Sequence, residues 1–158
     1  MQRAKTTKDV TQAPTHTDFL RAVVPDNLTA HPGILPILRM VCAPPIARDR
    51  LIGLAHVSKN LVSSMEGKPD HPPRIPPRMS RTDSDEQLAR ICETIIELAD
   101  RDLFSWLETG KNPSKNRITR AASVVADRLC GATADPIIRN AQERRQLELI
   151  QKWLELRE

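Results

Sequence analysis

Two acids and a lysine, Asp49, Glu66 and Lys68, come closer to a reactive site than any other residues of this chain. Magnesium-dependent nucleases use such a set, with two carboxylates that hold the hard cation and a lysine that helps to place the attacking water. Here both acids fall within one helix-forming stretch, residues 43–67. A single helix would hold them about 25 Å apart, because each residue adds about 1.5 Å. We therefore predict no catalytic residue and no metal ligand.

Histidine and cysteine also fail to form a recognisable site. The four histidines lie at least fifteen residues apart, and no Cys-x-x-Cys pair accompanies them, which argues against a zinc site. Cys42 precedes an expected helix start, where the pKa of a thiol can be lowered. The sequence does not indicate a partner base for this thiol. The alternative, that Cys42 is a small buried residue, is favoured.

The three cysteines, Cys42, Cys92 and Cys130, are widely spaced, and no signal peptide begins the chain. This pattern is typical of reduced thiols in the cytoplasm. No apolar run approaches the roughly 20 residues that span a bilayer, so no membrane partner is expected.

Basic side chains are the more informative group. Residues 1–81 carry twelve basic and six acidic side chains, a net charge of +6, whereas residues 82–158 carry twelve and fourteen, a net charge of −2. Lysine and arginine are the usual contacts to DNA phosphates. We predict phosphate contact by Arg48, Arg50, Lys59, Arg74, Arg78 and Arg81, and as second choices by Arg139, Arg144 and Arg145. The alternative is a solvated surface with intrahelical pairs such as Glu148–Lys152.

The elements that would position these side chains are helices. Aromatic residues are scarce, two Phe, two Trp and no Tyr, so a core must be built from aliphatic side chains, and no strand pattern is found. The sequence predicts an all-α, irregular multi-helix domain with a proline-rich connector. Its expected parts are a disordered arm (1–16), basic front helices (17–66), the connector (67–83) and a helical bundle (84–158).

Several boundaries follow from capping signals in the front half. Pro25 is expected to end a first helix, and Ile34, Leu35, Leu38 and Val41 recur at helical spacing in a second. Pro44 and Pro45 would open a single helix that Gly67 ends, and Ser84–Gln87 have the spacing of a capping box.

Further signals divide the second half. Asp102 is expected to begin a short helix that Gly110 ends, Asn112-Pro113 to open another that Gly131 closes, and Asp135-Pro136 to begin the last. That last helix reaches residue 158 without a cap, so we expect a truncated chain. Its apolar stripe would pack on a partner and consists of Leu147, Ile150, Trp153, Leu154 and Leu156.

Two long blocks, "APPIARDRLIGLAHVSKNLVSSMEGK" (43–68) and "ASVVADRLCGATADPIIRNAQERRQLELIQKWLELRE" (122–158), carry a family resemblance. Together with the intervening "ADRDLFSWLETGKNPS", they resemble the amino-terminal helical part of XamI-type type II restriction endonucleases over roughly residues 18–158. The resemblance implies cleavage of double-stranded DNA at a short specific sequence with magnesium. It also implies a catalytic acid-x-Lys segment on a strand after the last helix, and this chain contains no such segment.

The resemblance therefore predicts a fragment that is inactive alone, lacks the C-terminal nuclease half and serves DNA binding or dimerisation. A homodimer is expected because palindromic sites are usually met by two-fold symmetric proteins. The alternative is a small α-helical protein-interaction module that is complete as it stands and uses its last helix as the binding surface.

Overall fold

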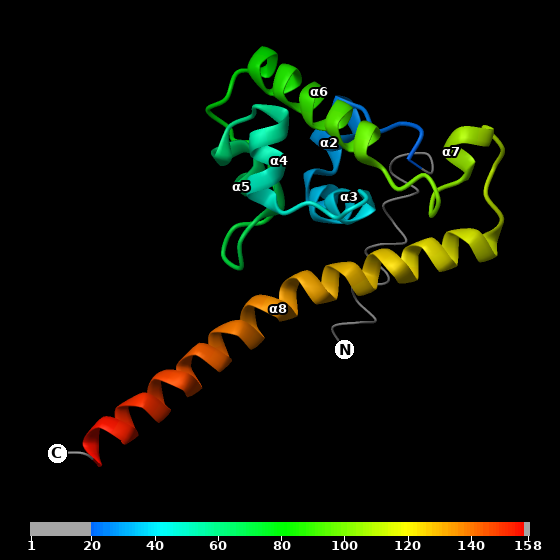
Figure 1. Ribbon diagram of the computed structural model, residues 1–158. Coiled ribbons are helices and arrows are strands. Elements are labelled where there is room, and N and C mark those ends of the chain that lie inside the picture. The colour runs from blue at the N-terminus through cyan, green and yellow to red at the C-terminus, as the bar shows by residue number, and fades with distance from the viewer. Residues whose placement is uncertain (1–19, 157–158) are drawn as a thin grey trace.

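The computed structural model describes residues 20–156, and at residues 133–140 and 142 it describes the backbone alone. The described residues form helices and no strand, so the prediction of an all-α fold is confirmed (Figure 1). In chain order the elements are α2 (Pro25–Ala30), the 3-10 turn η1 (Pro32–Ile34), α3 (Leu35–Val41), α4 (Arg48–Ala55), α5 (Lys59–Glu66), α6 (Arg81–Leu98), α7 (Trp106–Thr109) and α8 (Lys115–Glu155).

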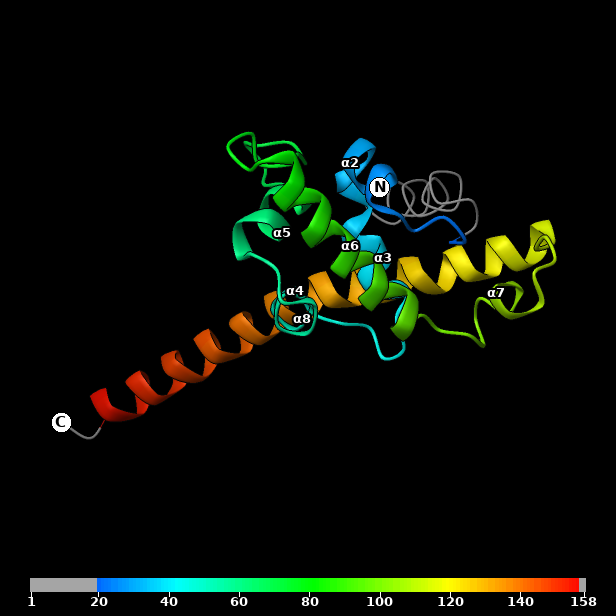
Figure 2. The ribbon, with the colours of Figure 1, turned by 90° about the horizontal axis from the view of Figure 1, so that it is seen from above.

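The short helix α3 lies at the centre of the packed part, in contact with both α6 and α8. Figure 1 shows α6 above it and α8 below it, and the C-terminal half of α8 runs out beyond the other helices in both views (Figures 1 and 2). The predicted stripe of η1 and α3 is confirmed, because its members Ile34, Leu35, Leu38 and Val41 are all buried. A helix that is apolar on nearly every side is stable only when other helices cover it, as they do here.

Residues 43–66 form two helices, not the single helix that the sequence predicts. α4 ends at His56, whose backbone is left-handed, with φ 53° and ψ 51°. The Ser58 hydroxyl then accepts a hydrogen bond from the N–H of Leu61 at 3.0 Å and so begins α5. The turn lets both Leu51 and Leu61 reach one core, where each is fully buried. The estimate of about 25 Å between Asp49 and Glu66 assumed one straight helix, and that assumption is wrong.

Two more boundaries in the front half differ from prediction. Pro25 begins α2 instead of ending a helix, because a missing N–H and a fixed φ suit the first helical position. The expected helix ahead of it falls partly on residues 17–19, outside the described residues. Pro44 and Pro45 lie before the cap of α4, which is Ala47, so they do not form its first turn.

α6 begins at Arg81, so the connector ends three residues earlier than predicted. The Ser80 hydroxyl caps the helix by accepting the N–H of Asp83 at 3.1 Å. Ser84, the expected cap, lies inside the helix, where it is buried and its hydroxyl donates to the carbonyl of Arg81 at 3.0 Å. The capping box at Ser84–Gln87 is therefore wrong.

In the second half the expected helix starts shift, one expected stop is found at Gly110 and the other, at Gly131, is not. Asp100, not Asp102, accepts the N–H of Leu103 at 3.0 Å, and α7 begins only at Trp106. Gly110 ends α7 with φ 68°, as predicted.

Ser114, not the Asn112-Pro113 pair, caps α8, which then continues for 41 residues through Gly131 and Pro136. The predictions that Gly131 closes this helix and that Asp135-Pro136 begin another are therefore wrong. In a helix interior a glycine costs about 1 kcal/mol, and a proline costs about 3 kcal/mol through a lost hydrogen bond and a ring clash.

Candidate nucleic-acid interface

The two acids that suggested nuclease chemistry lie on different helices and are used differently. Asp49 is an exposed residue of the first turn of α4. Glu66 ends α5 and accepts a hydrogen bond from Nε of Arg39 at 2.7 Å, with both side chains largely buried. Arg39 also donates to the carbonyl of Ile46 at 2.9 Å, so this ion pair fastens α5 and the loop before α4 to α3. These carboxylates do not fit a magnesium ion, because one of them already neutralises an arginine.

No group of three or more His, Cys, Asp or Glu side chains in the described part of the chain is arranged to hold a metal. His31, His56 and His71 are exposed and lie on three separate turns, and His16 falls outside the described residues. The sequence expectation of no zinc site concerns the whole chain and stays a prediction.

Cys42 is not activated. It follows α3 and is fully buried, and its thiol donates to the carbonyl of Leu38 at 3.6 Å. Burial raises the pKa of the thiol to about 11, although the positive charges of Arg128 and Arg39 act in the other direction. The possibility of a lowered pKa is therefore wrong, and the alternative of a small buried residue is confirmed. Burial likewise raises the pKa of Cys92 to about 12.

The six first-choice basic residues are all exposed, and they sit on α4, α5, the connector and the start of α6. Arg48 and Arg50 lie in the first turn of α4, and Lys59 is the first residue of α5. Arg81, the first residue of α6, approaches Asp85 at 3.8 Å, but both side chains are well exposed and such a pair holds the arginine weakly. The arrangement is a set of solvent-facing charges spread over neighbouring elements, as a phosphate-contacting surface would need.

The second-choice residues lie elsewhere. Arg144 and Arg145 are exposed residues of α8, and the C-terminal half of this helix runs away from the front helices (Figure 1). Arg139 belongs to the same helix, but its side chain is outside the described residues. The structure therefore separates the eight predicted contacts whose side chains it describes into two regions.

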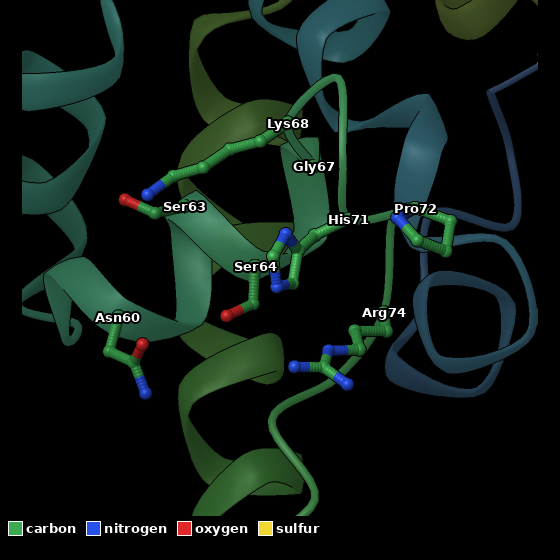
Figure 3. A pocket seen from close by; sticks show the side chains of 8 residues that line it. All are labelled: Asn60, Ser63, Ser64, Gly67, Lys68, His71, Pro72 and Arg74. Carbon is green, nitrogen blue, oxygen red and sulfur yellow. The ribbon is translucent and has the colours of Figure 1, made fainter.

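One pocket, of about 150 Å³, brings basic residues together between α5 and the connector (Figure 3). Backbone bonds build it: the N–H of Lys68 donates to the carbonyl of His71 at 2.8 Å, and the N–H of Arg74 donates to the carbonyl of Ser64 at 2.9 Å. The lining residues are Asn60, Ser63, Ser64, Gly67, Lys68, His71, Pro72 and Arg74.

Gly67 makes this fold-back possible. Its φ is 76°, a left-handed conformation that favours glycine. A Cβ at this position would lie 2.9 Å from both the ring Cδ and the nitrogen of Pro73. The glycine that was predicted as a helix cap is confirmed as one, and it also lets the connector return along α5.

Arg74 is the one predicted phosphate contact that lines this pocket. The sequence offered no signal for Asn60, Ser63 or Ser64, because hydroxyl and amide side chains on a helix have many explanations. Their place beside Lys68 depends on how residues 67–74 turn back, and no local pattern encodes that turn.

A second polar cluster joins α8 to the rest of the fold. Arg128 donates from Nη2 to Oδ2 of Asp100 at 2.9 Å and from Nη1 to the carbonyl of Met40 at 3.0 Å. The N–H of Leu103 and the Arg128 guanidinium both bond to the Asp100 carboxylate, and they lower its pKa. Sequence reasoning missed this cluster, since its members are separated by 28 and more residues. Its role is to hold α8 against α3.

The comparisons with known proteins place this all-helical chain among nucleases. Residues 18–158 match the XamI restriction endonuclease family, and the chain belongs to that family. The resemblance seen in the sequence is confirmed.

The type II restriction enzyme SalI of Streptomyces albus G is 51% identical to this chain over 153 residues. The match covers 96% of this chain and 47% of that enzyme, so the chain spans about half of its relative's length. No solved structure matches. None of the helices in the described residues is long and apolar enough to cross a membrane.

Proposed function

We propose that this chain forms the DNA-contacting helical part of a cytoplasmic type II restriction endonuclease. The observation that carries the proposal is the 51% identity to the restriction enzyme SalI over 96% of the chain. The exposed basic residues of α4, α5 and the connector support a role in phosphate contact, because they face solvent on adjacent elements.

In this proposal, residues outside this chain carry out the cleavage of DNA. Magnesium supplies charge neutralisation and an activated water in this class of reaction. The Arg39–Glu66 ion pair argues against a magnesium site at Glu66, which was the acid with the most suggestive spacing. We propose that the complete enzyme binds magnesium in a nuclease half outside this chain, and that this chain alone does not cut DNA.

The test is a titration of a mixed-sequence duplex of about 20 base pairs at several salt concentrations, followed by fluorescence anisotropy. The proposal expects an affinity that falls steeply with salt and no cleavage when magnesium is added. Absence of binding at 50 mM salt would contradict DNA contact, and cutting by this chain alone would contradict the assignment of catalysis elsewhere. Sequencing the encoding DNA beyond the codon for Glu158 then tests for a segment with strands and an acid-x-Lys motif.

The projecting half of α8 favours a second candidate function, protein interaction. Its apolar side chains are 52–87% exposed: Leu147, Leu149, Ile150, Trp153, Leu154 and Leu156. A surface of this kind suits either a homodimer contact within a restriction enzyme or the binding face of a helical interaction module. Light scattering of the purified chain separates the candidates: self-association with no salt-sensitive affinity for DNA would favour the interaction module.

A further inference from the structure

The pocket between α5 and the connector has a more specific chemistry than a basic surface. Two basic side chains, Lys68 and Arg74, border it together with the imidazole of His71. Ser63 and Ser64 add hydroxyl groups, and no carboxylate is among the lining residues. Every polar side chain at this site can donate a hydrogen bond, which is the requirement for binding an oxyanion.

The donors line the pocket from two sides. Figure 3 shows the Arg74 guanidinium and the His71 imidazole on the side of the Ser64 hydroxyl, and the Lys68 ammonium beside the Ser63 hydroxyl on the other side. The backbone beneath them is held by the Lys68–His71 turn, with N–H to carbonyl distances of 2.8 and 3.0 Å. A site whose backbone is fixed in advance loses less entropy when it binds a ligand.

The charges of these side chains are not used within the fold. Among the described residues no ion pair involves Lys68 or Arg74, whereas Arg39 and Arg128 are each paired with a carboxylate at 2.7 and 2.9 Å. The structure thus contains two kinds of arginine, those that hold helices together and those available to a ligand. Arg74 is of the second kind.

Two features that oppose the binding of an anion at this site are weakened by contacts within the fold. The C-terminal end of α5 carries a partial negative charge, but the carbonyls of Ser63 and Ser64 already accept the N–H groups of Gly67 and Arg74 at 3.1 and 2.9 Å. The carboxylate of Glu66 is neutralised by Arg39.

We infer that this pocket binds a single phosphate group through Lys68, Arg74 and the hydroxyls of Ser63 and Ser64. A pocket of about 150 Å³ is smaller than the 300–1,000 Å³ of usual small-molecule sites, so it suits a group of a few atoms. The source of the phosphate rests on the proposed function: a backbone phosphodiester of duplex DNA. A free phosphate or phosphomonoester has the same chemistry and is the other source that the experiment distinguishes.

The experiment compares two double variants of equal charge. Lys68→Gln with Arg74→Gln removes the two basic side chains from the pocket, and Arg90→Gln with Lys115→Gln removes two exposed cations elsewhere. The affinity of each double variant for duplex DNA is measured at several salt concentrations. The pocket variant is expected to bind about tenfold more weakly, with a salt slope reduced by about one, as for one lost phosphate contact. The control is expected to change affinity by about twofold or less, because distant charges are screened.

A second measurement uses inorganic phosphate and a 5′-hydroxyl duplex as separate probes in amide-resolved NMR titrations. Both are expected to shift signals of residues 63–71 in the wild-type chain, and neither in the pocket variant. Ser64→Ala, which removes a hydroxyl without changing charge, is expected to weaken phosphate binding with the salt slope unchanged. Circular dichroism checks that each variant is folded.

The outcomes separate this inference from the proposed function. Equal affinity loss in the pocket and control variants, with salt-sensitive duplex binding by the wild type, overturns the pocket and leaves the DNA contact standing. Phosphate shifts without duplex binding keep the pocket, assign it to a phosphomonoester and overturn the DNA contact. Failure of both probes overturns both.

Discussion

The two halves of α8 share one continuous helix and differ in what their side chains meet. The first half faces α3 with small residues, Ala121, Ala122, Val125 and Ala126, none more than 4% exposed. The second half carries larger apolar side chains that are at least half exposed, among them Leu147 and Trp153. Small side chains let two helices approach closely, whereas large ones gain from burial only when a partner covers them.

Polar contacts divide the helix in the same way. Arg128 in the first half reaches across to Asp100 and to the carbonyl of Met40. In the second half Gln151 donates to Glu155 at 3.1 Å, a contact within the helix itself. The length of a helix therefore does not determine its role. The same helix is a core element at one end and an exposed surface at the other.

The largest difference between the two halves of α8 is expected when a charge is placed in the packed half. Val125→Asp buries a carboxylate without a partner and is expected to lower the free energy of unfolding by about 4 kcal/mol. Urea unfolding followed by circular dichroism measures the change. Leu149→Asp, at a position 59% exposed, is the matched control and is expected to cost less than about 0.5 kcal/mol. Equal costs would mean that the two halves are not different environments.

Removing the contacts of Arg128 with Asp100 and Met40 is expected to have the next largest effect on stability. Arg128→Met keeps the length of the side chain but leaves the Asp100 carboxylate and the Met40 carbonyl without this donor. We expect a loss of about 2 kcal/mol, below the 3–5 kcal/mol of a fully buried pair, because the Arg128 and Asp100 side chains are 26% and 14% exposed. In a double-mutant cycle with Asp100→Asn the two losses should add to more than the loss of the double variant. Strict additivity would show that the pair is not coupled.

Low pH is expected to weaken the same contact between Arg128 and Asp100. The pKa of Asp100 is lowered from its ordinary value of 3.8, first by the hydrogen bond from the N–H of Leu103 and then by Arg128. A lowered pKa in the folded state contributes stability above pH 3.8, and this contribution is lost as the pH falls below that value toward the folded pKa. The wild type should therefore be more stable than Asp100→Asn at pH 6, and the difference should shrink at pH 3. An unchanged difference would contradict the role of the ionised carboxylate.

The smallest effect on stability is expected in the projecting half. Leu147→Gln, Ile150→Gln and Leu154→Gln together should change the free energy of unfolding by less than about 1 kcal/mol, since each side chain is at least half exposed. Self-association measured by light scattering should decrease instead. A stability loss of several kcal/mol would show that this face is covered within the folded chain.

Sequence periodicity was reliable where helices are short and apolar. The spacing of Ile34, Leu35, Leu38 and Val41 predicted the buried face of the central helix, because covering those side chains is the main source of its stability. Capping signals were less reliable where two candidates compete. Ser80 and Ser84 are each followed three residues later by a suitable side chain, Asp83 and Gln87, so local chemistry does not choose between them.

The tertiary structure makes that choice. Gln87 accepts the N–H of Ser58 at 2.8 Å, so its side chain ties α6 to the start of α5 instead of capping its own helix. The break at His56 lies between Leu51 and Leu61, which are both fully buried in the core.

For the candidate site, the sequence predicted Arg74 and the excess of positive charge around it, since charge is a property of composition. It did not predict that Ser63 and Ser64 would line a pocket with Lys68, or that Glu66 would be neutralised by Arg39, 27 residues before it.

By itself, then, the sequence determined the helical fold class, the family and the basic character of the front half, all of which follow from residue types and their order. The tertiary structure alone decided three things. It set where helices break, which arginines pair with carboxylates and which half of α8 is covered. Those outcomes depend on partners that are distant in the chain, and no local pattern contains them.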